Sequence, residues 1–165
     1  MTAWPKQSEC NSFYGDPRGS NGGPSPKWEK DNLMLVPAPW KLVTAWDGSP
    51  VRGIRCHIKC AESLERVLAE IWEAAYRKQE VIEEWGMNLF GGGYNFRLMR
   101  GGSALSMHSW GCAVDFDPAR NVFGSKKINF VNCPSVLHAF AHEDWTWGGE
   151  WKRPDGQHFQ AARVG

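Results

Sequence analysis

Residues 106–117 read SMHSWGCAVDFD and combine a loop with a short strand. From Cys112 onward the residues alternate, so Asp115 projects from one face of the strand and the larger apolar side chains project from the other. His108 lies before the strand, across a turn that Gly111 permits, and it can reach the face that carries Asp115. Carboxylates on the open face of a strand need a function, and this one predicts a polar site.

The periodicity upstream predicts two more strands and a long helix. Residues 54–58 alternate between apolar and polar types and predict a strand with His57 facing outward. Residues 64–84 place apolar side chains three and four positions apart, which predicts one helix that stops before Gly86. After three glycines, residues 94–99 alternate again, and Arg97 is predicted to project away from the larger apolar residues of that strand.

Weaker signals complete the predicted fold. Residues 134–143 predict a short helix, and a brief strand is expected from His158. The fold class predicted is α+β, with a small antiparallel sheet, a long helix packed behind it and the functional site on the open face. We expect one domain over residues 1–165, in which residues 1–50 form an irregular lead-in packed on the core.

Composition excludes several classes of protein. The 165 residues carry a net charge of +1 with no block of like charges, so nucleic acid is not expected as a partner. No stretch reaches the ~18 apolar residues of a membrane span. The first thirty residues contain no basic segment that leads into an apolar run, so no signal peptide is expected and a start in the cytoplasm is predicted. The five cysteines form no C-x-x-C pair and are expected to be free, mostly buried thiols.

Four polar residues in the second half match the needs of a catalytic zinc site. Such a site uses three protein ligands, commonly His and carboxylate, and a nearby general base. His108 and Asp115 come from one local unit of the chain. Asp155 and His158 stand three residues apart at a turn beside Gly156, where one can act as base and the other as ligand.

Residues 106–115 resemble the S-x-H-x-x-G-x-A-x-D signature of zinc D-alanyl-D-alanine carboxypeptidases and L-alanyl-D-glutamate endopeptidases, and residues 155–159, DGQHF, resemble their second motif. The resemblance implies the hedgehog/DD-peptidase fold, a Zn²⁺ cofactor and three metal ligands. It assigns the ligand roles to His108, Asp115 and His158, and the role of general base to Asp155.

The resemblance also implies an arginine before the first motif that polarises the scissile carbonyl or holds a substrate carboxylate. Arg97 is the first choice and Arg100 the second. Ser106 is expected to support the zinc shell or contact a substrate carboxylate. Many relatives carry Glu where Asp155 stands, and the Asp resembles the endopeptidase branch.

The activity implied by this resemblance is zinc-dependent hydrolysis of peptidoglycan stem peptides. The favoured bond is L-alanyl-D-glutamate, cut by a monomeric phage-type endolysin that waits in the host cytoplasm and acts on the wall after release. A D-alanyl-D-alanine carboxypeptidase is the alternative within the same chemistry. Two alternatives do not involve peptide hydrolysis. One is a catalytically silent, zinc-stabilised module that binds the cell wall. The other is a Trp-rich carbohydrate-binding module, which would bind saccharide without metal.

Other residues that resemble site components have structural explanations. His138 and His142 lack the glutamate of an H-E-x-x-H helix and are expected near the surface or behind the site. Cys56 and Cys60 have no further pair to complete a zinc knuckle. Asp117 precedes a proline and is expected to begin a turn. Three tryptophans close to the second motif fit equally well in the core or along a substrate groove, and they are Trp145, Trp147 and Trp151.

Overall fold

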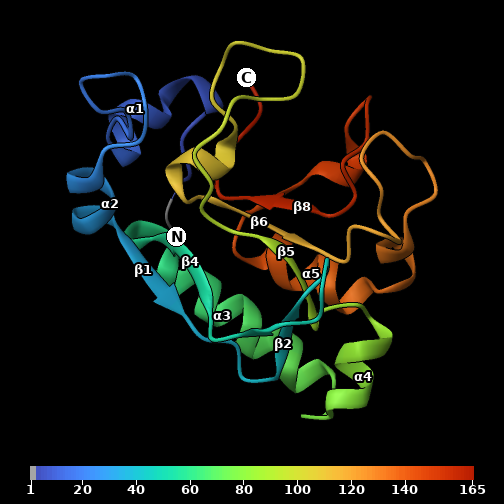
Figure 1. Ribbon diagram of the computed structural model, residues 1–165. Coiled ribbons are helices and arrows are strands. Elements are labelled where there is room, and N and C mark those ends of the chain that lie inside the picture. Colours follow the sequence, from blue (N-terminus) through green and yellow to red (C-terminus); the bar gives the residue numbers. More distant parts are fainter. Residues whose placement is uncertain (1–2) are drawn as a thin grey trace.

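The computed structural model describes residues 3–165 (Figure 1). Residues 1 and 2 of the predicted domain lie outside this description. The α-helices are α1 (Cys10–Tyr14), α2 (Pro26–Asn32), α3 (Ile58–Ala74), α4 (Gln79–Glu84) and α5 (Pro134–His142). The strands are β1 (Leu33–Val36), β2 (Leu42–Thr44), β3 (Pro50–Val51), β4 (Ile54–His57), β5 (Leu89–Gly92), β6 (Ala113–Phe116), β7 (Thr146–Trp147) and β8 (His158–Gln160). Short 3₁₀ turns are η1 (Gln7–Glu9), η2 (Met107–Trp110), η3 (Asn129–Asn132) and η4 (Gly148–Glu150).

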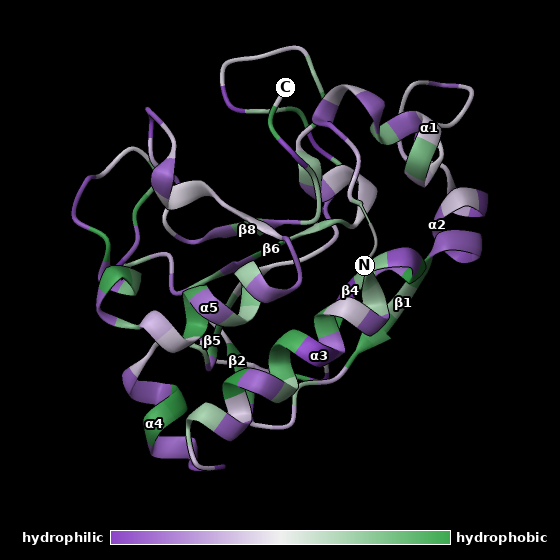
Figure 2. Cartoon of the chain, turned by 180° about the vertical axis from the view of Figure 1, so that it is seen from behind, coloured by the Kyte–Doolittle hydropathy of each residue, from purple (hydrophilic) through white to green (hydrophobic). Residues whose placement is uncertain are grey.

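The central sheet has the strand order β3-β2-β5-β6-β8-β7, and β1 pairs with β4 in a separate ribbon. Seen from behind, α5 lies in front of β5 and β2, and α3 packs beside α5 and extends towards β4 and β1 (Figure 2). The α+β class is confirmed. The prediction of a purely antiparallel sheet was wrong, because β2 and β5 are parallel. These two strands are joined by a long crossover through α3 and α4, which a parallel pair requires.

The predicted helix over residues 64–84 is two helices with a break between them. Tyr76 and Arg77 adopt φ values of +56° and +55°, which a continuous α-helix excludes. The first helix also begins earlier than predicted, at Ile58, because the His57 side chain accepts a hydrogen bond from the Lys59 backbone N–H and caps it. His57 is therefore buried and Ile58 exposed, the reverse of the strand pattern.

No strand forms over residues 94–99, and the strand that enters the sheet is β5, which includes the first glycines. A side chain at Gly91 would meet the Cβ of Asp115 at 3.1 Å, so glycine lets β5 approach β6 at the site. The following segment is held by backbone hydrogen bonds from Tyr94 N–H to the carbonyl of Arg55 in β4 and from Asn95 N–H to the carbonyl of His108 in η2. The prediction failed because alternation in a short segment does not guarantee a neighbouring strand.

The N-terminal segment contains regular elements and contributes to the hydrophobic core. Its buried aromatic residues are Trp4, Tyr14, Trp28 and Trp40. The Tyr14 hydroxyl donates to the carbonyl of Ala161 at 2.7 Å, which ties α1 to the residue directly after β8. All five cysteines are free and buried, as predicted. No helix within residues 3–165 is long and apolar enough to cross a membrane.

Candidate metal centre

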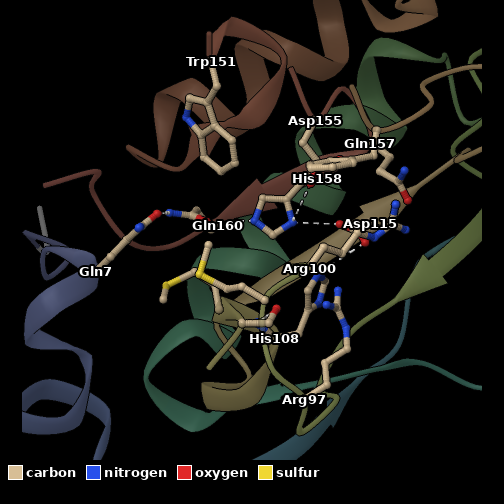
Figure 3. A pocket seen from close by; sticks show the side chains of 14 residues that line it. Gln7, Arg97, Arg100, His108, Asp115, Trp151, Asp155, Gln157, His158 and Gln160 are labelled. Carbon is tan, nitrogen blue, oxygen red and sulfur yellow. Dashed lines mark hydrogen bonds and ion pairs between the residues drawn. The ribbon is translucent and has the colours of Figure 1, made fainter. Parts of the chain in front are cut away.

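Three side chains from two adjacent strands and one turn meet on the open face of the sheet (Figure 3). Asp115 on β6 and His158 on β8 are paired neighbours in the antiparallel register. His108 comes from η2, directly before β6. One potential ligand atom from each of the three residues lies within 4.8 Å of the other two. The pairing of β6 with β8 therefore brings the two sequence motifs together.

The His108 ring has one nitrogen engaged and one without a partner. Nδ1 lies 2.8 Å from the carbonyl oxygen of Gly93, an acceptor, so the proton belongs on Nδ1. Nε2 then carries a lone pair that points at Asp115 Oδ2, 3.2 Å away. This Nε2 is buried and has no hydrogen-bond partner. A proton or a metal cation between these two buried atoms would satisfy both of them.

His158 is arranged in the same way with its nitrogens exchanged. Nε2 lies 2.8 Å from Gln160 Oε1, and the Gln160 amide donates from its nitrogen to Gln7 and to the carbonyl of Ala162, so its oxygen must face the imidazole. The Nδ1 atom is directed at Asp115 Oδ1, 2.9 Å away. This hydrogen-bonded chain orients His158 for binding a cation through Nδ1.

The electrostatics of the cluster also favour added positive charge. Burial would raise the pKa of Asp115, but His108 and His158 outweigh burial and lower it well below its usual range. Burial would lower the pKa of His158, yet the hydrogen bond and charge of Asp115 raise it above its ordinary value. Two imidazoles and one carboxylate are a donor set that zinc accepts, with a fourth position left for water or substrate. The residues present therefore fit a catalytic Zn²⁺.

Asp155 stands beside the three potential ligands but does not join them. Its Oδ2 lies 4.0 Å from His158 Nδ1, and its Oδ1 is buried without a hydrogen-bond partner. Burial raises the pKa of this carboxyl, although nearby His158 opposes the rise. A carboxylate with a raised pKa and a free oxygen is suited to accept a proton.

The turn that presents Asp155 depends on tight backbone contacts. A side chain at Gly148 would meet the carbonyl oxygen of Asp155 at 2.6 Å. Trp147 donates its indole N–H to the carbonyl of Gly156 at 2.9 Å and is absent from the pocket lining. Of the two roles expected for Trp147, support behind the site or contact with substrate, this hydrogen bond favours support, since the indole holds the turn between Asp155 and His158.

A pocket of about 150 Å³ opens over the cluster, and Arg97, Arg100, Ser106 and Trp151 all line it. The Arg97 backbone is held by Ser109, whose hydroxyl accepts from Arg97 N–H at 3.1 Å and donates to its carbonyl at 2.9 Å. Ser106 accepts a hydrogen bond from the His108 N–H at 3.3 Å and so begins the turn that carries this histidine. Both arginines face the pocket although neither lies on a strand.

The remaining tryptophans and histidines take different places. Trp145 is buried and donates a hydrogen bond to Ser63, so it belongs to the core. Trp151 lines the pocket instead, and its ring centroid lies 5.6 Å from that of His158. His138 and His142 are exposed on α5.

Two more structural interpretations agree with the structure. Asp117 begins a turn, is buried and accepts from Arg120 at 2.7 Å. Within the described part of the chain, Cys56 and Cys60 join no group of metal-binding side chains.

The structure adds site residues that the motifs did not identify. Gln160 orients His158, Gln7 orients Gln160, and the carbonyl of Gly93 sets the tautomer of His108. Gln160 follows His158 by two positions on the same strand and therefore shares its face, a signal available in the sequence. Gln7 lies far away along the chain, and no local pattern indicates it.

Comparison with known proteins gives one match. Residues 100–161 match the sequence model of the D-alanyl-D-alanine carboxypeptidase family. No curated protein and no solved structure gives a significant match. The matched segment contains His108, Asp115, Asp155 and His158, and it supports a hydrolase of the metallopeptidase class that acts on peptidoglycan, in a family known for its dependence on zinc.

Proposed function

We propose that this protein is a zinc metallopeptidase that hydrolyses peptidoglycan stem peptides, with L-alanyl-D-glutamate as the favoured bond. The observation that carries the proposal is the convergence of His108 Nε2, His158 Nδ1 and the Asp115 carboxylate. Each histidine has its other nitrogen bound to an acceptor, so both present lone pairs to the same point. The unpartnered carboxylate of Asp155 stands beside this point.

Each site residue then has a defined chemical role. A zinc ion held there supplies a Lewis acid that acidifies water and polarises the scissile carbonyl. Asp155 takes the proton of the attacking water and returns it to the leaving amine. Arg97 directs its positive charge at the developing oxyanion or at the carboxylate next to the scissile bond. Trp151 lies against His158 and excludes water from one side of the pocket.

The choice of L-alanyl-D-glutamate as the scissile bond rests on the identity of the proposed general base, Asp155. Asp155 occupies the position where the resemblance places Asp in endopeptidases, so we favour L-alanyl-D-glutamate. The family match itself is to D-alanyl-D-alanine carboxypeptidases, which makes the terminal D-alanyl-D-alanine bond the second candidate. Both substrates carry a free carboxylate on the residue that leaves, and both need the same zinc chemistry.

Mass spectrometry of purified peptidoglycan after incubation with the zinc-loaded protein tests the function and identifies the bond. We expect new stem-peptide fragments that end at L-alanine, and their loss in an Asp155→Asn variant and in the chelated protein. Release of single D-alanine residues would assign the carboxypeptidase instead. Unchanged peptidoglycan from a protein shown by elemental analysis to hold one zinc would contradict the proposal and favour a silent binding module.

We further propose that the protein acts as a phage-type endolysin. It would accumulate in the host cytoplasm and reach the cell wall after the inner membrane is opened. Expression in bacteria tests this role, with the inner membrane left intact or permeabilised at a set time. Lysis that requires permeabilisation is the expected result, and it should disappear in the Asp155→Asn variant. Lysis at the same rate without permeabilisation would contradict this route.

A further inference from the structure

Two arginines from different loops contact the same aromatic ring at the rim of the pocket. The guanidinium carbon of Arg100 lies 4.9 Å from the Phe123 ring centroid, and that of Arg153 lies 4.7 Å from it. Arg100 and Phe123 line the pocket itself. Arg153 belongs to the loop between Trp151 and Asp155, two other residues of the pocket lining. We call these three residues, Arg100, Phe123 and Arg153, the rim cluster.

Across residues 3–165, neither arginine of the rim cluster forms a direct ion pair, although the charge of Arg100 acts on the Asp155 carboxylate from a longer distance. By contrast, Arg66, Arg77 and Arg120 all form ion pairs. Two neighbouring cations repel each other, and a cation over an aromatic face recovers only part of that cost. Guanidinium groups collected without direct counter-ions at a pocket are arranged to receive an anion.

The charge balance of the pocket points the same way. A divalent ion held by the three residues would be balanced in charge by the carboxylates of Asp115 and Asp155. The remaining charge comes from Arg97 and Arg100 inside the pocket and from Arg153 at the rim. Arg97 would pair with the substrate carboxylate beside the scissile bond. The rim cluster is left for a second negative group of the substrate.

We propose that the rim cluster is a subsite for a second carboxylate, which selects acidic stem peptides with a free carboxylate beyond the residue next to the scissile bond. The proposal rests on the proposed function, because it assumes a peptide in this pocket. A third residue of the diaminopimelate type supplies such a carboxylate, whereas lysine at that position does not. The rim cluster would therefore make the protein cleave peptidoglycan with diaminopimelate at the third position faster than peptidoglycan with lysine there.

Two synthetic peptides isolate the effect of this second carboxylate on binding and cleavage. One is L-alanyl-γ-D-glutamyl-meso-diaminopimelate, and the other carries a carboxamide in place of the outer diaminopimelate carboxylate. They have the same size and differ by one charge. Binding is measured by calorimetry with the zinc-loaded Asp155→Asn variant, and cleavage with the unsubstituted protein, both at 0.15 M salt to screen distant charges.

We expect the free acid to bind about tenfold more tightly than the amide, the size of one charge-assisted hydrogen bond. Adding Arg153→Gln should reduce this ratio towards one. The matched control is Lys127→Gln, which removes one exposed positive charge from the loop that carries Phe123 without touching the ring. This control should keep the ratio.

Equal binding of the two peptides would overturn the subsite. An equal loss of preference in Arg153→Gln and Lys127→Gln would also overturn it, because diffuse charge would then explain the effect. Failure of the unsubstituted protein to cut either peptide would instead count against the proposed function, and the binding ratio would still test the rim cluster.

Discussion

At the scale of single residues, the two histidines proposed as zinc ligands owe their orientation to acceptors on their far sides. His108 is oriented by a backbone carbonyl, which no substitution of a side chain removes, and His158 by Gln160. Gln160 is fully buried and its amide is fixed by two acceptors of its own. The tautomer of His158 therefore depends on a side chain that can be changed.

Replacing Gln160 with leucine should weaken zinc binding. Loss of the acceptor removes the partner of His158 Nε2 and frees the ring to present the wrong nitrogen, an effect of about 10- to 100-fold in affinity. Competition with a chromophoric chelator measures it. Gln160→Glu retains an acceptor oxygen and should stay closer to the unsubstituted protein; equal affinity of all three proteins would contradict the role assigned to Gln160.

His57 should make stability depend on pH. Burial lowers its pKa to about 4 from the ordinary 6.5, so the unfolded chain binds the extra proton between these values. Stability is therefore fully present above about pH 6.5 and falls as the pH drops towards 4, by about 3 kcal/mol, since each pKa unit is worth about 1.4 kcal/mol.

Urea unfolding of the metal-free protein at several pH values checks this expectation. In a His57→Gln variant the loss of stability between pH 6.5 and pH 4 should shrink by about that amount, although the variant is less stable at neutral pH because the cap of α3 is altered. An unchanged pH dependence in the variant would exclude His57 as its source.

At the scale of elements, the approach of α4 to the turn after β6 depends on one glycine. Gly86 follows α4 with φ +78°, and an added Cβ would lie 2.2 Å from Asp117 Oδ2. Asp117 cannot move freely, because it is buried and bound to Arg120. A side chain at Gly86 would therefore disturb the junction that supports β6, the strand of Asp115.

A Gly86→Ala variant should lose about 3 kcal/mol or more of unfolding free energy, from a left-handed backbone and the clash together. Gly48→Ala is the matched control, since Gly48 has φ +73° and no atom near its added Cβ. The control should lose about 1 kcal/mol. Denaturant unfolding measures both, and equal losses would show that the contact with Asp117 adds nothing.

At the scale of the whole molecule, the two ends of the chain are joined. Lys6 forms a bridge with Arg163, and Arg163 N–H donates to the carbonyl of Pro5 at 2.7 Å. Trp4 is buried and donates its indole N–H to the carbonyl of Glu143 at 2.8 Å. These contacts support our proposal that the N-terminal segment and the rest of the chain form one domain.

If so, a Trp4→Ala variant should lower the stability of the entire protein by about 3–5 kcal/mol, the cost of removing a buried aromatic ring. Unfolding followed by tryptophan fluorescence and by far-UV circular dichroism should give one coincident transition. An early, separate transition for the N-terminal segment would show that it is not part of the same cooperative unit.

Zinc should stabilise the fold as a whole, because its proposed ligands join η2, β6 and β8. At a free zinc concentration about 1,000 times the dissociation constant the gain is about 4 kcal/mol, which corresponds to roughly 10 °C in melting temperature for a chain of this size. Calorimetry with zinc and with a chelator checks it. A His158→Ala variant should show little difference between the two conditions; a similar rise in that variant would place the ion elsewhere.

The sequence was sufficient to predict features that depend on neighbouring residues. Alternation predicted β6, Pro134 marked the start of α5, and a brief strand was expected from His158, because such signals are local properties of the chain. The grouping of His108, Asp115, Asp155 and His158 was also predictable, since two compact motifs contain all four. Their roles remain proposals.

Only the tertiary structure decided features that depend on distant partners. The parallel pairing of β2 with β5, the support of His158 by Gln160 and Gln7, and the rim cluster all join segments far apart in sequence. The burial of His57 and the break after α3 also ran against the local pattern. The physical reason is that strand register, tautomer support and clustering of charge are set by which surfaces pack together, and packing is a property of the whole chain.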